Sequence, residues 1–364
     1  MRLACCVLTR SALRLAMKMR WCVDEPVDVY ASEKLAADAD AAEDIHWFAR
    51  LSDVVKEIFS AYDALVFIMA AGIAVRMTAP HLKSKLTDPA ILVFDERGKY
   101  GISLLSGHVG GGNALARSLC RAIGAEPVIT TATDVNGCLA PDALSGPLGL
   151  RPWPKEHIRR INRAVLAGDA VCWRIDRTLP HGEWYRQKLL QAGQQAVLCG
   201  KEDMLKNPGP LDVLVLGRSD CHAIRNLPED CLCMTPRRLI AGIGCRRGVP
   251  EALVMQALDK ACRRIGVDCS FLDALASTSF KAQEEGLLAA GRSIGCPVLF
   301  YENEEMASAI RKYHLNESSF VKQTLGIGNV CEAAACCCTG KAGGRMALCK
   351  TKFEKVTVAL IWEK

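Results

Sequence analysis

The stretch 104–116, LLSGHVGGGNALA, decides the fold, because it leads from an apolar run through a glycine-rich turn into a helical pattern. The run before Ser106 is short and apolar, which is typical of a buried strand. After Asn113 the apolar residues recur at helical spacing, and Gly124 suits the left-handed position that ends a helix. A strand, a glycine loop and a helix in this order predict a unit of an α/β protein.

The same alternation continues in both directions from this stretch. The short β-rich runs are ALVFIMA, AILVFD, GISLLS, PVIT, AVCWRI, DVLVLG, RLIAGIG, PVLFY and VTVALIW. Helical patterns separate most of them, so we expect an α/β fold of several domains, with mainly parallel sheets flanked by helices. The segment FDERGKYGIS is the exception, because it leaves no room for a helix and therefore predicts a hairpin.

The length of 364 residues is enough for two or three compact domains. A second strand-loop-helix unit, LIAGIGCRRGVPEALVMQALDKACRRIG, has Pro250 near its first helical turn and Gly266 as its stop. We place boundaries near 130 and near 237. The expected domains are an N-terminal region 1–130, a central region 131–236 and a C-terminal region 237–364.

The composition indicates a soluble globular protein, since 50% of the residues are hydrophobic and 24% are charged. The longest apolar run, 64–75, is too short to span a bilayer, and basic residues directly follow the apolar start, which argues against a signal peptide. The net charge of +6 is modest, and the basic residues are not interleaved with aromatic ones, so we expect no nucleic-acid partner. Small acidic ligands are the expected partners.

Cysteine is frequent, with 19 residues, but the number is odd and the sequence contains no C-x-x-C pair. A disulfide framework or a zinc ribbon is therefore not expected. Most of these cysteines should serve as small apolar residues in a reducing cytoplasm.

The glycine-rich loop has the spacing G-x-x-G-G-G, which matches neither the dinucleotide fingerprint nor the P-loop, and it lacks the G-x-S-x-G nucleophile turn. Free N–H groups at a helix start beside His108 could hold a carboxylate and move a proton near it. The alternative is a tight turn in which Ser106 or Asn113 only caps the helix.

Three other segments could contact an anion or transfer a proton. GIGCRRG offers Arg246 and Arg247 at a second helix start, unless it is a solvated basic turn. LGIGNVCEAAA places Asn329 and Glu332 at capping-box spacing, so Glu332 is either a cap or a base. TTATDVNG supplies Asp134, which either makes an Asx-turn or orients a catalytic histidine.

Several segments, read together, resemble the CbiG family of anaerobic cobalamin biosynthesis, in the family's order and over nearly the whole chain. The first is the segment 63–137, DALVFIMAAGIAVRMTAPHLKSKLTDPAILVFDERGKYGISLLSGHVGGGNALARSLCRAIGAEPVITTATDVNG. The others are LIAGIGCRRGVPEALVMQAL, LASTSFKAQEEGLLAAG, FVKQTLGIGNVCEAAA and KTKFEKVTVAL, which are similar to the family's C-terminal domain and to CobE of the aerobic route.

The resemblance implies a hydrolase that acts on a cobalt-bearing tetrapyrrole, cobalt-precorrin-5A. Water opens a δ-lactone on its ring A acetate, and the adjoining meso carbon leaves with its methyl group as acetaldehyde. For this chemistry we expect His108 as the general base, Asp134 as its orienting residue and Glu332 as a competing base. The expected substrate-binding residues are Arg76, Lys83, Lys85, Ser106, Gly107, Gly110, Gly111, Asn113, Gly244, Arg246, Arg247 and Gly328.

Cobalt enters inside the substrate, so we expect no protein metal site and no cofactor. Neighbouring enzymes of the pathway are possible partners. A non-catalytic corrinoid carrier is the alternative function, because of the similarity to CobE, and the glycine spacings disfavour a nucleotide-binding protein.

Overall fold

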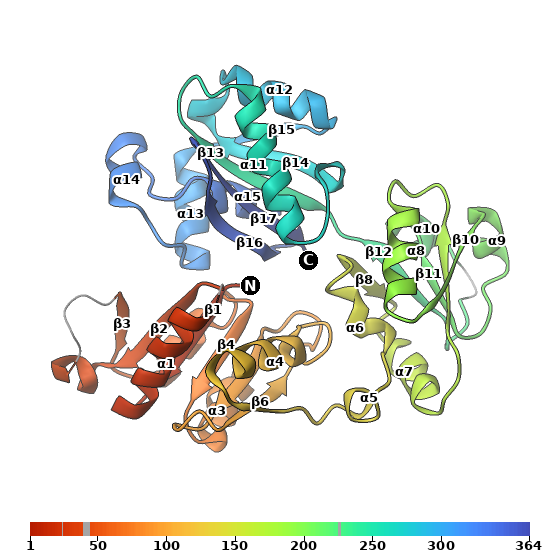
Figure 1. Ribbon diagram of the computed structural model, residues 1–364, viewed down its shortest axis with the longest axis horizontal. Helices are drawn as coiled ribbons and strands as arrows, with labels where there is room; N and C mark the ends of the chain where they lie inside the picture. Colours follow the sequence, from red (N-terminus) through yellow and green to blue (C-terminus); the bar gives the residue numbers. More distant parts are fainter. Residues whose placement is uncertain (24, 39–43, 225–226) are drawn as a thin grey trace. The chain divides into compact units, whose positions relative to one another are not determined.

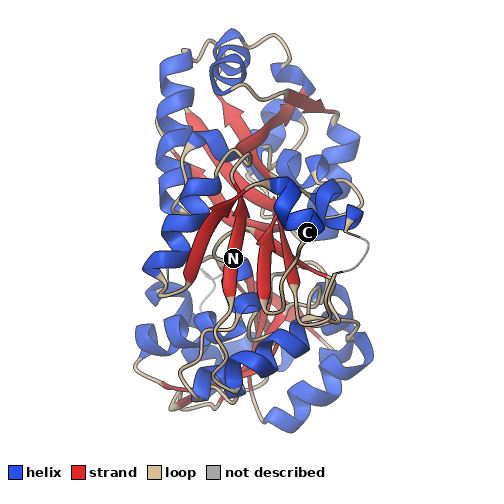
Figure 2. Cartoon of the chain, turned by 90° about the vertical axis from the view of Figure 1, so that its right-hand side faces the viewer, coloured by secondary structure: helices blue, strands red, loops and turns tan. Residues whose placement is uncertain are grey.

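A computed structural model describes residues 1–23, 25–38, 44–224 and 227–364 of the chain. The chain divides into two compact units. The first comprises Met1–Gly101, Ser118–Glu126 and Arg238–Lys364, and the second comprises Ile102–Arg117 and Pro127–Arg237. The predicted α/β class is confirmed, because three mainly parallel sheets are flanked by helices (Figures 1 and 2).

The first sheet has seven strands in the order β3-β2-β1-β4-β5-β6-β7 (Figure 1). They are β1 Leu3–Val7, β2 Val27–Ser32, β3 Ile45–Phe48, β4 Ala64–Ile68, β5 Ala90–Phe94, β6 Tyr100–Leu105 and β7 Glu126–Val128. The helices of this region are α1 Arg10–Cys22, α2 Leu51–Ile58, α3 Ala71–Thr78 and α4 Gly112–Ile123. The predicted hairpin joins the neighbouring strands β5 and β6, and Gly98 takes a positive φ of 64° in its turn.

The core of this sheet follows from three apolar strands. Every residue of β1, β4 and β5 is buried. Continuous apolar runs of this kind are typical of parallel strands covered on both faces. Cys5 and Cys6 lie in β1 without solvent exposure, so these thiols pack as small apolar side chains. All 19 cysteines are free thiols.

The second sheet has the order β10-β9-β11-β12-β8, in which only β8 pairs antiparallel. Its strands are β8 Leu150–Trp153, β9 Cys172–Asp176, β10 Gln195–Cys199, β11 Asp212–Val215 and β12 Leu232–Pro236. The helices of this region are α5 Ala132–Val135, α6 Pro141–Ser145, α7 Ile158–Leu166, α8 Gly182–Gln191, α9 Lys201–Lys206 and α10 Arg218–Ala223. The short helices α5 and α6 follow β7 and precede this sheet.

The third sheet has the order β15-β14-β13-β17-β16. Strands β13, β14 and β15 pair parallel, β17 pairs antiparallel with β13, and β16 pairs antiparallel with β17. Its strands are β13 Leu239–Cys245, β14 Leu272–Thr278, β15 Val298–Tyr301, β16 Gly344–Lys352 and β17 Val356–Glu363. Its helices are α11 Glu251–Arg264, α12 Glu285–Ile294, α13 Asn303–Tyr313, α14 Ser319–Leu325 and α15 Cys331–Cys338. The predicted domain boundaries near 130 and 237 stay predictions. The two compact units change near these positions, after Glu126 and after Arg237, but the first unit combines N-terminal with C-terminal segments.

Helix α15 lies so close to β13 that only glycine fits at position 242. A Cβ on Gly242 would lie 1.8 Å from the carbonyl oxygen of Cys331. We therefore expect Gly242→Ala to lower the free energy of unfolding by about 1–3 kcal/mol or more, as overpacked cores do. Urea unfolding measures this loss. Gly72→Ala is the control, because its Cβ would meet only the mobile end of Arg76, at 3.2 Å, and an equal loss in both variants would contradict the prediction.

Candidate active site

The glycine-rich loop between β6 and α4 uses its own carbonyl groups as hydrogen-bond acceptors. The N–H of Gly111 donates to the His108 carbonyl at 2.7 Å, that of Gly112 to Ser106 at 3.1 Å and that of Asn113 to Gly107 at 3.0 Å. A ligand carboxylate could reach these N–H groups only if the loop opened. The expectation that this helix start presents free N–H groups is therefore wrong for residues 111–113.

The glycines of this loop allow the chain to fold back tightly. A Cβ on Gly107 would lie 2.5 Å from Asn113 Oδ1, and a Cβ on Gly110 would lie 2.4 Å from the Cβ of Ser106. Gly111 has a φ of 74°, and Ser106 itself has a φ of 56°, which is uncommon for a residue with a side chain. The tight turn positions the His108 side chain between the short helices α5 and α6.

His108 lies between two carboxylates, one at each ring nitrogen. Its Nε2 is 2.9 Å from Asp134 Oδ2, and its Nδ1 is 3.3 Å from Asp142 Oδ1. The imidazole is 11% exposed, Asp134 18% and Asp142 2%. The hydroxyl of Thr133 lies 3.1 Å from the same Nε2. The structure thus brings the two predicted residues His108 and Asp134 together, and it adds Asp142 to them.

Asp134 is held by donors other than the histidine. Its Oδ2 accepts a hydrogen bond from Asn113 Nδ2 at 2.9 Å, and its Oδ1 pairs with Arg117 at 2.9 Å. Burial by itself would raise the pKa of Asp134, but the hydrogen bonds from Arg117, His108 and Asn113 outweigh burial and lower this pKa. Asp134 belongs to α5, and its carboxylate forms hydrogen bonds with the side chains of His108, Asn113 and Arg117, so it does not form the predicted Asx-turn.

The charge of His108 follows from these neighbours. The hydrogen bond to Asp142 raises the pKa of His108 most, burial opposes it, and Asp134 raises the pKa further. We infer an imidazolium whose N–H groups both point at carboxylates. In this arrangement neither ring nitrogen has a free lone pair for water, so the predicted role of general base requires one of the two contacts to open.

Four residues of this cluster were not predicted from the sequence: Arg117, Thr133, Asp142 and Asn162. Asp142 follows Pro141 at the start of α6, and Asn162 on α7 donates a hydrogen bond to Asp142 Oδ1 at 2.9 Å. A proline followed by an aspartate is common at the start of a helix, so the local sequence around Asp142 indicates a helix start and no functional role. Nothing in the spacing connects Asp142 with His108, because the turns around α5 and α6 bring them together.

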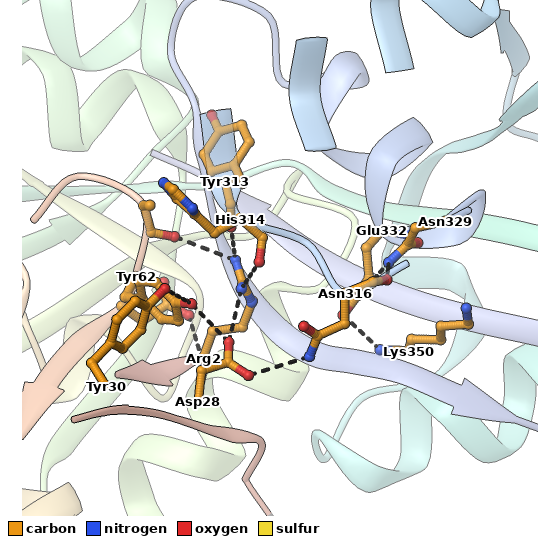
Figure 3. Close-up of polar contacts among 12 residues, drawn as sticks. Arg2, Asp28, Tyr30, Tyr62, Tyr313, His314, Asn316, Asn329, Glu332 and Lys350 are labelled. Carbon is orange, nitrogen blue, oxygen red and sulfur yellow. Dashed lines mark hydrogen bonds and ion pairs between the residues drawn. The ribbon is translucent and has the colours of Figure 1, made fainter. Parts of the chain in front are cut away.

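Glu332 lies in the first unit, in a polar network that extends through Asn329 and Asn316 to Asp28 (Figure 3). The Glu332 N–H donates to Asn329 Oδ1 at 3.2 Å, as a capping box predicts. The Glu332 carboxylate, however, accepts from the side-chain Nδ2 of Asn329 at 2.6 Å and not from the backbone N–H of Asn329. The other carboxylate oxygen accepts from the N–H of Lys350 at 3.0 Å. The reciprocal capping box is therefore only half formed, and the carboxylate of Glu332 instead connects α15 with β16.

The predicted cations lie on the surface. Arg76, Lys83 and Lys85 are exposed on α3 and the segment after it, and Arg246 and Arg247 are exposed after β13. The two predicted glycines elsewhere have structural partners. Gly244 accepts a hydrogen bond from the Thr357 hydroxyl at 3.2 Å, and Gly328 donates one to Glu317 at 3.1 Å.

The described ranges hold neither a cluster of metal ligands nor a helix that could span a membrane. No group of three or more histidine, cysteine or acidic side chains there could hold a metal ion. No helix in these ranges is both long and apolar enough to cross a membrane.

Comparison with known proteins places two parts of the chain in one family. Residues 53–134 match the family described as cobalamin synthesis G N-terminal, and residues 239–361 match cobalamin synthesis G C-terminus. The cobalt-precorrin-5A hydrolase of Salmonella typhimurium is 34% identical over 330 residues, which cover 88% of each chain. Protein CobE of a Sinorhizobium species is 30% identical over 97 residues, 27% of this chain and 62% of that protein.

A solved structure supports the fold. The crystal structure of a cobalamin biosynthesis protein G homolog from Sulfolobus solfataricus aligns with a TM-score of 0.58 at 20% identity. The alignment covers 100% of this chain and 97% of that one. At this identity the likeness bears on the fold alone.

Proposed function

Because the chain belongs to the cobalamin synthesis G (CbiG) family, we infer that it is a cobalt-precorrin-5A hydrolase of cobalamin biosynthesis. The observation that carries this conclusion is the similarity to the Salmonella protein of that name along most of both chains. The substrate is then a cobalt-corrinoid, and its metal arrives with it. We propose no resident cofactor and a cytoplasmic location, with neighbouring pathway enzymes as transient partners and no nucleic-acid partner.

The proposed chemistry is the hydrolysis of an activated ester in a ring. Water adds to the lactone carbonyl carbon, the ring C–O bond breaks, and the alkoxide that leaves takes up a proton. The meso carbon then carries a hydroxyl group, which loses its proton as the C–C bond to the macrocycle breaks. The meso carbon leaves with its methyl group as acetaldehyde, and the macrocycle keeps the electron pair of that bond. The reaction therefore needs a proton donor for the leaving oxygen and positive charge near the carbonyl oxygen.

We propose that the cluster around His108 meets these two needs. A protonated imidazole carries a transferable proton and a positive charge, and the carboxylates of Asp142 and Asp134, which raise the pKa of His108, favour this charged form. Asp134 occupies the Nε2 side, where a substrate oxygen could take its place. The exposed cations Arg76, Lys83, Lys85, Arg246 and Arg247 remain the proposed contacts for the substrate's acetate and propionate groups.

The test is anaerobic incubation of the purified chain with cobalt-precorrin-5A, with trapping of the aldehyde and mass analysis of the corrinoid. We expect acetaldehyde in an amount equal to the corrinoid consumed, and a corrinoid that has gained the elements of water and lost those of acetaldehyde. Corrinoid binding without acetaldehyde would instead favour a carrier, the function that the similarity to CobE first suggested.

A further inference from the structure

We propose that Asp142, and not Asp134, is the residue that orients His108, and that Asp134 is the partner which the substrate displaces from His108 Nε2. This assignment rests on the proposed function for its catalytic consequence. Asp142 touches no substrate in this proposal, so it is a positioning residue. The reacting nitrogen is then Nε2, on the side of Asp134.

Burial separates the two carboxylates. Asp142 is 2% exposed, and its carboxylate accepts a further hydrogen bond from Asn162, so it is held from both sides. The backbone carbonyl oxygen of Asp142 accepts a hydrogen bond from the buried hydroxyl of Ser145 at 2.6 Å, which fixes Asp142 further within α6. A buried carboxylate that loses its cation is strongly penalised. The contact between Asp142 and His108 Nδ1 should therefore persist when a ligand binds.

Asp134 can release the histidine at much lower cost. It is 18% exposed, and Asn113 and Arg117 continue to neutralise and hydrogen-bond it when His108 turns to another acceptor. Arg117 is itself 48% exposed and pairs with Asp134 Oδ1, the oxygen that does not contact His108. The shorter distance, 2.9 Å against 3.3 Å, belongs to Asp134, but water screens that contact more than the buried one. The pKa of His108 agrees, because Asp142 is its largest raising influence.

The arrangement determines which tautomer the neutral histidine adopts. When His108 loses one proton, Nδ1 keeps its proton in the hydrogen bond to the buried Asp142, and Nε2 loses its proton. A substrate oxygen at the Nε2 position can receive that proton, and Nε2 can later take one back. The buried carboxylate and the outward nitrogen then divide the work as in other carboxylate–histidine pairs.

Side-chain NMR of protein labelled with ¹⁵N-histidine tests this without any substrate, and the missing signal of His108→Ala assigns His108 among the 7 histidines. We expect wild-type His108 to deprotonate to the tautomer with its proton on Nδ1. We expect Asp134→Asn to preserve that tautomer. Asp142→Asn should lower the pKa of His108, and mix or reverse the tautomers. Loss of the Asp142 charge should also move the alkaline limb of the kcat profile to lower pH and reduce kcat at neutral pH about 10²-fold or more.

Controls separate this effect from a general loss of structure. Asp142→Glu keeps the charge and should restore the titration in part, and the exposed Asp169→Asn should change neither spectrum nor rate. A neutral wild-type His108 with its proton on Nε2 would overturn the proposal even if no Asp142 variant folds. An unchanged His108 titration in Asp142→Asn would also overturn it. A wild-type protein that shows the expected tautomer but releases no acetaldehyde would instead count against the proposed function.

Discussion

Replacing His108 by alanine lowers kcat for cobalt-precorrin-5A hydrolysis by roughly 10²- to 10⁴-fold, the usual contribution of a positioned proton donor or acceptor. The expected loss follows from the position of the imidazole between Asp134 and Asp142, which favours its charged form. Alanine supplies neither the proton for the leaving oxygen nor the positive charge. His108→Gln, which can hydrogen-bond but carries no charge, should lose as much. The assay is steady-state release of trapped acetaldehyde.

The matched control for this prediction is His222→Ala, a histidine in the same unit with an exposed side chain against the ring of Trp153. We expect it to retain the wild-type kcat. Far-ultraviolet circular dichroism should show that all three variants keep the native fold. A folded His108→Ala protein with full turnover would remove His108 from the reaction and would leave its cluster as a structural ion-pair network.

The elements of the fold could be predicted from local pattern, because apolar runs and glycine positions report on single strands and helix ends. The stretch 104–116 predicted the end of a strand before Ser106, a loop and the start of a helix, and the structure has the end of β6 at Leu105 and the start of α4 at Gly112. The hydrogen bonds of its loop could not be predicted. Ser106 has a positive φ in the loop whose carbonyl groups accept from the N–H groups of the helix start, and a serine gives no local signal for that conformation.

The composition of the site depended on distant contacts. Asp134 was a candidate because it follows a strand, but Asp142 met His108 only through the arrangement of α5 and α6. The Glu332 carboxylate accepts a hydrogen bond from the N–H of Lys350. Lys350 lies between Leu348 and Thr351, where the pairing of β16 with β17 is irregular. Register irregularities of this kind depend on the whole sheet.

The second large effect concerns stability, and it arises at Arg2, where the N-terminal and C-terminal segments of the first unit meet (Figure 3). The guanidinium is 3.3 Å from Asp28 Oδ2, and both residues are buried. It also donates to the carbonyl groups of Tyr313 and His314, at the C-terminal end of α13, where the helix dipole stabilises a positive charge. Tyr62 adds a hydrogen bond to Asp28 at 2.8 Å.

We expect Arg2→Met to lower the free energy of unfolding by about 3–5 kcal/mol, because it leaves the buried Asp28 carboxylate without its cation. Urea unfolding measures the loss, and hydrogen exchange of the α13 amides should locate it. The control is Arg292→Ala, which breaks an ion pair whose side chains are 64% and 76% exposed and should cost less than about 1 kcal/mol.

The double variant Arg2→Met/Asp28→Asn separates the two causes of this loss. If the uncompensated charge dominates, asparagine removes that charge while its oxygen still accepts from Tyr62, and the double variant should be more stable than Arg2→Met alone. If the cap on α13 dominates, the second substitution should recover nothing. An Arg2→Met protein as stable as Arg292→Ala would mean that neither the ion pair nor the cap joins the two segments, and that their apolar packing alone does so.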